Sequence, residues 1–336
     1  MRPTLQDVAD ATGVTLATAS RALSGAYGVH PDTRKRVLEV AAQLDYKANR
    51  FARGLVTGRS NAIGLIISDI RNSYFAETAR GVEDAAYKAG MDVLLCNSDV
   101  DSGKQMHYIN SLIEKRVDGI IMNSVATLTT EEQGYIAASG IPVVLLNRAA
   151  DNTQFSTVCA DNERGGRLMA ECLLAHGHRN IVHFTGPRNN SNLAIRTKGF
   201  LDGLRRAGKL EATVIHGLHT MEGGYQMAKN LLRSPGKVTA ISTANDTVAF
   251  GVIKAALEMG VRIPEDISLG GFDDVELAEL VHPPLTTIRQ PKYEMGAAAL
   301  EMVMKLANDK HRVPEHRVLG VELMERASIA KPPTRR

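Results

Sequence analysis

The residues best suited to binding chemistry are polar side chains that stand just after short apolar runs between residues 62 and 275. Asparagine, aspartate and arginine carry planar groups that hydrogen-bond adjacent hydroxyls, often bidentately, and aromatic faces can stack on a sugar ring. The candidates are Asp69, Ser73, Tyr74, Phe75, Asn147, Arg148, Asp161, Arg188, Asn190, Arg196, Asn245, Asp246, Phe272, Asp273 and Asp274. Together they predict a binding site for a small hydroxylated molecule.

Several of these candidates also have a purely structural interpretation. Asp161 and Asp246 could cap helices, Asp273 and Asp274 could form a turn, and Arg196 could pair with a neighbouring carboxylate. Their shared position at strand ends favours ligand binding for the set as a whole.

The elements that must position these residues alternate short apolar runs with helical stretches, a pattern typical of parallel sheets built from βαβ units. Two such series predict an α/β body of two parallel-sheet lobes, with a ligand site between them at the strand ends. The predicted strands are 63–67, 93–95, 119–122, 143–146, 181–184, 213–215, 240–242 and 267–269, and the predicted helices are 74–90, 103–116, 130–139, 162–176, 193–207, 222–233 and 246–259. Residues near 287–307 are expected to return to the first lobe and those near 318–327 to close the second.

The charge of the predicted ligand is indicated by three arginines. Arg148, Arg188 and Arg196 would favour an anion such as a sugar acid or a phosphosugar. Because the chain contains no tryptophan, ring stacking must come from a tyrosine or phenylalanine.

A second kind of chemistry is indicated by the charge distribution. The first sixty residues carry nine basic and five acidic side chains, a net charge of +4, whereas the whole 336-residue chain carries only +3. The last six residues add three more positive charges. A basic N-terminal segment on a slightly acidic body indicates a polyanionic partner, although a solvated basic surface would have the same composition.

The N-terminal segment has the pattern of a helix-turn-helix. Thr4 can cap a first helix and form a capping box with Asp7, Gly13 interrupts, and Thr15 can cap a second helix. Pro31 begins a predicted third helix. Val14, Ala19 and Leu23 would face inward, the third helix would bury Val37, Val40, Ala41 and Leu44, and the outer face of the second would carry Leu16, Ala17, Ser20 and Arg21.

The segments 4–9, 13–15, 18–23, 46–49 and 52–55 resemble the DNA-binding head of the LacI/GalR (lac repressor) family, and the similarity covers essentially the whole chain. The resemblance implies a recognition helix in the major groove, where Arg21 would bind a guanine. Leu16 and Ala17 would touch a thymine methyl, or simply pack. The phosphate and sugar contacts would come from Thr15, Thr18 and Ser20.

The resemblance also implies that a short helix over residues 49–56 orders in the minor groove at the operator centre. Asn49 and Arg53 would lie on the DNA, and Leu55 would wedge between base steps and kink the duplex. The alternative interpretation of this segment is a basic, flexible linker.

For the ligand, the family's effector positions are matched best by Arg196, Asp246 and Asp273, and next by Tyr74, Asn147, Arg148 and Asn190. Two positions depart from the common pattern, because Asn147 stands where many members have an acid and His219 where many have an aromatic residue. The full set of predicted effector contacts is Tyr74, Phe75, Asn147, Arg148, Asp161, Asn190, Arg196, His219, Asp246 and Asp273.

The expected organisation is an N-terminal all-α helix-turn-helix head joined to a two-lobed body like that of periplasmic binding proteins. The head would span residues 1–48, the hinge 49–60, the effector-binding and dimerisation domain 61–330, and a tail 331–336. Within the body, the first lobe would take about 61–158 and 287–316, and the second about 159–286 and 317–330. The tail has no leucine heptad, so a coiled-coil tetramer is not expected.

Several function classes are disfavoured. No apolar run approaches the length of a membrane span, no export signal is visible, and Cys96, Cys159 and Cys172 lack disulfide spacing, which predicts a cytoplasmic protein. Phosphate-loop, esterase and zinc-protease motifs are missing, and no metal site, cofactor or enzymatic activity is expected. The sequence predicts a ligand-responsive, sequence-specific transcription regulator, most simply a repressor, that acts as a homodimer on a near-palindromic operator and senses a sugar, sugar acid or phosphosugar. The alternative is a solute-binding transport protein for a sugar.

Overall fold

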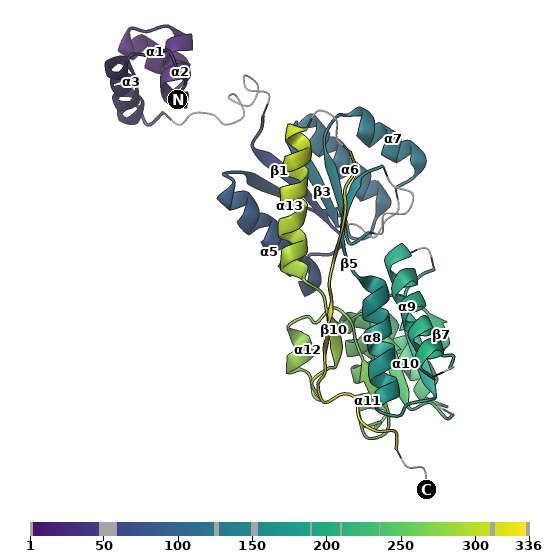
Figure 1. Cartoon of the computed structure of the whole chain (residues 1–336). Coiled ribbons are helices and arrows are strands. Elements are labelled where there is room, and N and C mark those ends of the chain that lie inside the picture. Colours follow the sequence, from purple (N-terminus) through teal and green to yellow (C-terminus); the bar gives the residue numbers. More distant parts are fainter. Residues whose placement is uncertain are drawn as a thin grey trace. The chain divides into compact units, whose positions relative to one another are not determined.

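The computed structural model describes residues 3–46, 59–123, 128–148, 154–188, 190–208, 210–234, 236–309 and 313–333. The chain forms two compact units, Met1–Asn61 and Ala62–Arg336 (Figure 1). The predicted hinge helix, with Asn49, Arg53 and Leu55, lies outside the described residues. Within the described part of the chain, no helix combines the length and apolarity that a membrane span requires.

The described part of the N-terminal unit is a bundle of three helices, α1 (Leu5–Thr12), α2 (Leu16–Ser24) and α3 (Pro31–Gln43). The predicted capping box of Thr4 and the predicted cap at Thr15 are confirmed, and Gly13 ends α1 at a φ of 66°, a left-handed conformation that favours glycine. The core of this unit consists of Val8, Ala9, Ala19, Ala22, Val37 and Ala41. Of the predicted stripe on α3, Val40 is half-buried and Leu44 is exposed, because α3 buries only one narrow face.

The first lobe of the body is a six-stranded parallel sheet covered by helices. Its strand order is β11-β5-β4-β3-β1-β2, and pairing is in register from Ala62 with Asp92 and from Ile63 with Gly119. The elements are β1 (Ala62–Ile67), α5 (Ser73–Lys88), β2 (Asp92–Asn97), α6 (Ser102–Glu114), β3 (Gly119–Asn123), α7 (Thr130–Ala138), β4 (Val143–Leu146), β5 (Ser156–Ala160), α13 (Lys292–Asn308) and β11 (His316–Leu319). The central strands β1, β3 and β4 are near-continuous apolar runs because helices cover both faces of a parallel sheet.

The second lobe repeats the plan with a four-stranded parallel sheet of order β7-β6-β8-β9. Its elements are α8 (Asn162–Ala175), β6 (Ile181–Thr185), α9 (Ser191–Gly208), β7 (Thr213–His216), α10 (Met221–Leu232), β8 (Ala240–Thr243), α11 (Asp246–Glu258), β9 (Ser268–Gly270) and α12 (Leu277–Leu280). The predicted strands and helices of both lobes are confirmed to within a few residues.

The chain crosses between the lobes three times, and two crossings differ from the expected boundaries. The expectation assigned residues from 159 and from 317 to the second lobe, whereas β5 continues to Ala160 and β11 pairs with it in the first sheet, from His316 with Thr157 to Leu319 with Ala160. The strand β5 was not predicted. It lies between β4 and β11, and β11 follows it by more than 150 residues. Periodicity identifies a strand but not the sheet that it joins.

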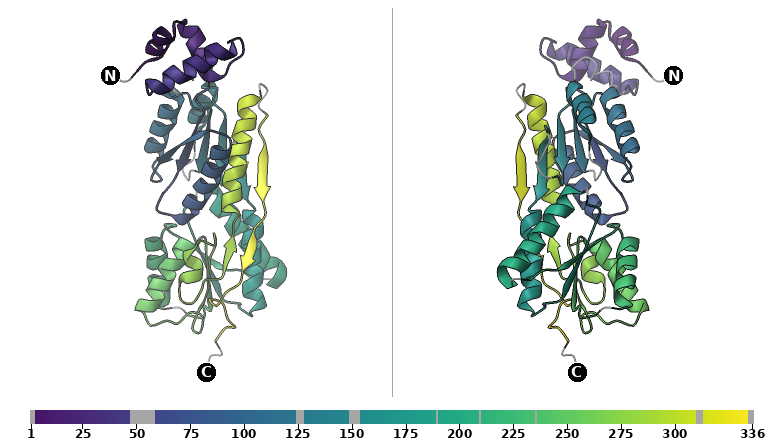
Figure 2. Two further views of the ribbon diagram at one scale, coloured as in Figure 1. Left: turned by 90° about the vertical axis from the view of Figure 1, so that its left-hand side faces the viewer. Right: turned by 90° about the vertical axis from the view of Figure 1, so that its right-hand side faces the viewer.

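The remaining crossing strand, β10 (Thr287–Arg289), pairs antiparallel with β12 (Glu322–Met324) between the lobes. In Figure 2 the C-terminal segment, drawn in yellow, passes from the first lobe into the second beside α13. The chain segment that follows β10 therefore enters α13 directly from the junction of the two lobes.

Helices α5 and α13 pack backbone to backbone on the first lobe. A Cβ added to Gly81 would lie 2.0 Å from the carbonyl oxygen of Tyr293, and one added to Gly296 would lie 2.1 Å from that of Thr78. Only glycine permits this approach. The start of α5, which reaches the ligand site, is consequently held tightly against α13.

Candidate functional site

A cavity of about 520 Å³ lies between the two lobes at the carboxyl ends of their strands. This is the volume and the position typical of a small-molecule site in such folds. The cavity is lined from the first lobe by Ser68, Asp69, Arg71, Asn72, Ser73, Tyr74, Phe75, Val100, Asn123, Asn147 and Arg148, and from the second by Asn190, Ser191, Asn192, Leu193, Arg196, His219, Thr220, Met221, Glu222, Asn245, Thr247, Phe250, Asp273, Val275 and Leu277.

The first turn of α5 brings two aromatic rings to the cavity. Asn72 caps the helix through its side chain, and the rings of Tyr74 and Phe75 meet edge to face at 5.2 Å. Burial raises the pKa of the Tyr74 phenol, and the Asp273 carboxylate raises it further, while the nearby Asn123 amide opposes this shift. The Tyr74 hydroxyl and the Asn123 amide lie close together, but neither Tyr74 Oη nor Asn123 Nδ2 makes a hydrogen bond of normal distance and angle to a described residue.

The end of β4 supplies Asn147 and Arg148. Asn147 has a φ of 52°, and its backbone N–H donates to the carbonyl of Val158 at 2.8 Å. Its Oδ1 atom is buried and finds no partner in the described parts of the chain. Burial lowers the pKa of the Arg148 guanidinium.

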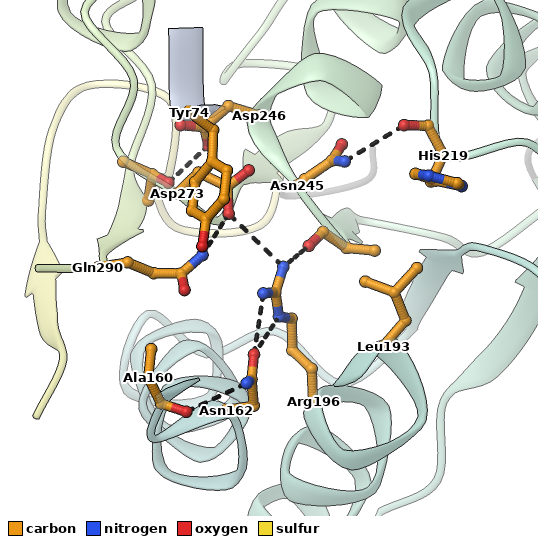
Figure 3. Close-up of polar contacts among 12 residues, drawn as sticks. Tyr74, Ala160, Asn162, Leu193, Arg196, His219, Asn245, Asp246, Asp273 and Gln290 are labelled. Atoms are coloured by element: carbon orange, nitrogen blue, oxygen red, sulfur yellow. Dashed lines mark hydrogen bonds and ion pairs between the residues drawn. The ribbon is translucent and has the colours of Figure 1, made fainter. Parts of the chain in front are cut away.

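Arg196 projects from α9 into the interior and is the central cation of the second lobe (Figure 3). Its Nη2 and Nε donate to Oδ1 of Asn162 at 2.9 and 3.2 Å, and its Nη1 donates to the carbonyl of Ala244. The guanidinium lies 3.4 Å from the ring centroid of Phe272, and Nη1 is 3.7 Å from Oδ1 of Asp273. Burial lowers the pKa of Arg196, and Asp273 opposes that shift.

Asp273 holds its side chain against the cavity from an unusual backbone. Its φ is 119°, and Gln290 donates to its carboxylate at 2.6 Å. Burial raises the pKa of this carboxyl group, and the cations of Arg196 and Lys292 oppose the rise. Asp273 and Arg196 therefore form an oriented charge pair at the cavity wall. The predicted alternative, in which Arg196 pairs with a neighbouring carboxylate, is thus also present.

Two predicted contacts, Asp246 and Asp161, are not among the residues that line the cavity. Asp246 is fully buried at the start of α11, where its carboxylate accepts from Thr287 Oγ1 at 2.6 Å and from the backbone N–H of Val275 at 3.0 Å. Burial raises its pKa, and Asp273 raises it further. Asp161 caps α8 by accepting from the N–H of Arg164.

The wall of the second lobe is completed by residues around the helix starts. Asn190 accepts from the N–H of Leu193, and Asn245 caps α11 and donates to the carbonyl of His219 at 3.2 Å (Figure 3). Burial lowers the pKa of His219 and favours its neutral form, and Nδ1 lacks a partner among the residues described. The buried Oδ1 atom of Asn192 also lacks a hydrogen-bond partner among the described residues.

The cavity thus combines buried hydrogen-bonding atoms of both kinds, and none of them is satisfied by the described protein. They are the donor Asn123 Nδ2, the acceptors Asn147 Oδ1 and Asn192 Oδ1, and the dual groups Tyr74 Oη and His219 Nδ1. Asn123 and Asn192 were not predicted. Asn123 ends a strand and follows the same rule as the other candidates, whereas Asn192 lies inside the first turn of α9 and only the packing places it in the cavity.

The charged residues of the wall are three arginines and three acids, so their formal charges cancel: Arg71, Arg148 and Arg196 against Asp69, Glu222 and Asp273. Arg71 is bound bidentately by Asp69, with Nε···Oδ1 and Nη2···Oδ2 both 2.9 Å, and Arg196 faces Asp273. Arg188 is exposed and does not line the cavity. The argument for an anionic ligand, which combined three arginines, therefore loses much of its basis.

In the N-terminal unit, the exposed face of α2 carries the residues predicted to contact DNA. Thr15 Oγ1 accepts from the N–H of Thr18, and the two hydroxyl oxygens are 2.9 Å apart, which fixes the first turn. Leu16 is 46% exposed, and Ala17, Ser20 and Arg21 are also exposed. Leu16 lies outside the core of this unit and is not among the residues packed against it, so the interpretation that it simply packs is not favoured.

Comparison with known proteins covers both units. Residues 4–49 match the bacterial regulatory proteins of the lacI family, and residues 60–326 match the periplasmic binding proteins and sugar binding domain of the LacI family. The catabolite control protein A of Priestia megaterium is 36% identical over 92% of this chain and 93% of its own. Two solved structures are each 28% identical: a lac repressor dimer bound to operator and the anti-inducer ONPF (98% and 100% of the two chains, TM-score 0.87), and a complex of the regulator CelR with cellobiose (97% and 100%, TM-score 0.74).

Proposed function

Because the chain belongs to the LacI family of bacterial transcription regulators, we propose that it is a repressor whose operator affinity is set by a neutral, hydroxyl-rich sugar bound between the lobes. As a homodimer it would bind a near-palindromic operator, since a twofold protein matches a twofold DNA site. Its work on DNA would place it in the cytoplasm, and no catalytic step is part of the proposal.

The observation that carries this proposal is the set of unsatisfied polar atoms in one cavity. A buried polar atom without a hydrogen-bond partner lowers the stability of the unliganded protein by about 1–3 kcal/mol. A ligand that forms hydrogen bonds with several such atoms removes this cost and therefore binds more tightly. A sugar hydroxyl both donates and accepts, which matches a wall that mixes amide donors, amide oxygens and a phenol. The balanced charges of the wall favour a neutral sugar over a sugar acid or a phosphosugar.

The contacts that select the sugar would be divided between the lobes. Asp273 and Arg196 would hold adjacent hydroxyls with their planar groups, and Tyr74 and Asn147 would bind from the first lobe. Asp161 caps α8, and Asp246 binds Thr287 and the backbone of Val275, so neither aspartate would touch the sugar.

The DNA contacts would come from the exposed face of α2, with Arg21 bound to a guanine and Leu16 to a thymine methyl. Asn49, Arg53 and Leu55 would act in the minor groove. Sugar binding would favour one arrangement of the lobes and so change the relative positions of the two helix-turn-helix units in the dimer. This would be a shift between conformations that are already populated without the sugar.

The test has two parts. Thermal unfolding is followed with D-ribose, D-glucose, cellobiose, D-gluconate and glucose 6-phosphate, where a ligand at about 100 times its Kd adds about 2.7 kcal/mol to the free energy of unfolding. Duplexes selected by the protein from a random pool are then tested by gel shift with and without the stabilising sugar.

We expect stabilisation by a neutral sugar and a changed operator affinity in its presence. Stabilisation only by gluconate or glucose 6-phosphate would refute the neutral class. Sugar binding without selection of any duplex at low salt would refute regulation and favour a solute-binding protein, which requires no DNA-binding head.

A further inference from the structure

The corner that carries Asp273 is held by a buried cation from the other lobe. Asp273 and Asp274 follow β9 with φ angles of 119° and 51°, two consecutive residues in a region that favours glycine. The Nζ atom of Lys292 donates to their carbonyl oxygens at 2.8 and 2.9 Å. Lys292 is only 3% exposed, although lysine is almost never buried without a partner.

The same ammonium group is anchored in the first lobe. Lys292 begins α13, and its Nζ lies 3.2 Å from Oε2 of Glu77 on α5. These three partners equal the three donors of an ammonium group. Glu77 lies one helical turn after Tyr74, which lines the cavity, so α5 carries both a ligand-facing side chain and the anchor of Lys292.

We propose that Lys292 and Glu77 are a positioning pair that fixes the Asp273 carboxylate for ligand binding and links it to α5 across the junction of the lobes. The inference rests on the proposed function for its consequence, since the ligand site is the one described above. The pair acts through Asp273 and does not itself line the cavity.

The other contacts of the corner do not replace this link. Arg289 and Arg326 bind the Asp274 carboxylate, each at 2.7 Å, and Gln290 donates to that of Asp273. The backbone N–H of Asp273 donates to the carbonyl of Ile288 at 2.8 Å, but none of these contacts reaches the carbonyl oxygens of Asp273 and Asp274. Lys292 binds the backbone oxygens, and therefore it restrains the φ and ψ angles that aim the Asp273 side chain. Without it, two carbonyl oxygens lose their donor and the strained backbone can relax.

The first experiment is amide hydrogen exchange on the full chain without ligand. Lys292→Met keeps the length of the side chain and removes its charge and donors, while Glu77→Gln changes a half-exposed group and preserves the fold. The first control is Lys305→Met, which removes an exposed lysine on α13 that pairs with Glu315 outside the helix. The second is Glu294→Gln, which changes an exposed acid in the first turn of α13.

We expect exchange within residues 272–276 to quicken roughly 10- to 100-fold in Lys292→Met, the range for losing a hydrogen bond to a charged donor, and less in Glu77→Gln. The controls should leave this segment unchanged. Unaltered exchange at the corner in both test variants would overturn the proposal, and so would a uniform increase over the whole body, which would mean that the pair only adds stability. If Lys292→Met fails to fold, Glu77→Gln decides.

The second experiment uses cellobiose, or D-ribose if only that sugar stabilises the wild type. Glu77→Gln should weaken sugar binding about threefold to tenfold and bring the ratio of operator affinities with and without sugar closer to one, whereas Glu294→Gln should not. Unchanged affinity and an unchanged ratio would refute the link. If the wild type binds neither of these sugars, D-glucose takes their place. If it binds none of the three neutral sugars, the ligand proposed above is wrong, and the exchange experiment still judges the positioning pair.

Discussion

Tyr74→Phe should change stability and ligand binding in opposite directions. The Tyr74 side chain is 3% exposed, and its hydroxyl has no hydrogen-bond partner among the described residues. Replacing tyrosine by phenylalanine retains the edge-to-face contact with Phe75 and removes only the unsatisfied oxygen. The cost of that oxygen, about 1–3 kcal/mol, is therefore relieved in the unliganded protein.

We expect the free energy of unfolding of Tyr74→Phe to rise by about 1–2 kcal/mol, or roughly 2–8 °C in Tm for a body of this size. Sugar binding should weaken about fivefold to tenfold, because a hydroxyl that the ligand would satisfy is gone. Urea unfolding without ligand gives the first quantity, and calorimetric titration with the sugar that stabilises the wild type gives the second.

Tyr293→Phe is the matched control. The Tyr293 hydroxyl donates to Asp84 at 3.2 Å, so its removal should slightly lower the free energy of unfolding and leave sugar binding unchanged. A Tyr74→Phe variant that is destabilised as much as this control would show that the Tyr74 hydroxyl is already satisfied. The argument from unsatisfied atoms to a hydroxyl-rich ligand would then fail.

Other perturbations test DNA reading, pH dependence and packing. Arg21→Ala should lose about 1–3 kcal/mol of discrimination at one base position in gel shifts of singly substituted operators, whereas Arg53→Ala should weaken all duplexes alike and reduce the salt slope by about one; the reverse pattern would exchange their roles. Burial raises the pKa of Asp246 above its value in the unfolded chain, so its contribution to stability is complete below about pH 4 and is lost as the pH rises through the raised pKa. In urea unfolding, Asp246→Asn should remove this decline of stability with pH. An unchanged dependence of the free energy of unfolding on pH would contradict the assignment. Gly81→Ala should cost about 1–3 kcal/mol or more, because its Cβ would lie 2.0 Å from the Tyr293 carbonyl oxygen; wild-type thermal stability would show that α5 can move away from α13.

Local signals in the sequence were sufficient for the elements and for many of the candidate residues. The capping box at Thr4 and the cap at Thr15 depend on residues three apart, and apolar runs such as 119–122 mark strands directly. The rule that polar residues at strand ends face the ligand placed Asn147 and Asp273 at the cavity wall.

The same rule could not separate residues that face the cavity from those that support it. Asn245 and Asp246 are neighbours at the start of α11, yet Asn245 lines the cavity and Asp246 is buried against Thr287. The direction of the Asp246 side chain is fixed by its contact with Thr287 on β10, which lies about forty residues further along the chain. Strand β5 was not predicted either; it lies between β4 and β11 in the first sheet, and β11 follows it by more than 150 residues.

Side chains a few positions apart were enough to identify the helix-turn-helix, the alternating α/β elements and the resemblance to a regulator family. The pairing of Arg196 with Asp273, the position of Arg188 outside the cavity and the reach of Lys292 to a corner of the other lobe became visible only in the fold. Charge balance and hydrogen-bond satisfaction depend on distances of about 3–4 Å between residues far apart in sequence, and only the folded topology creates those distances.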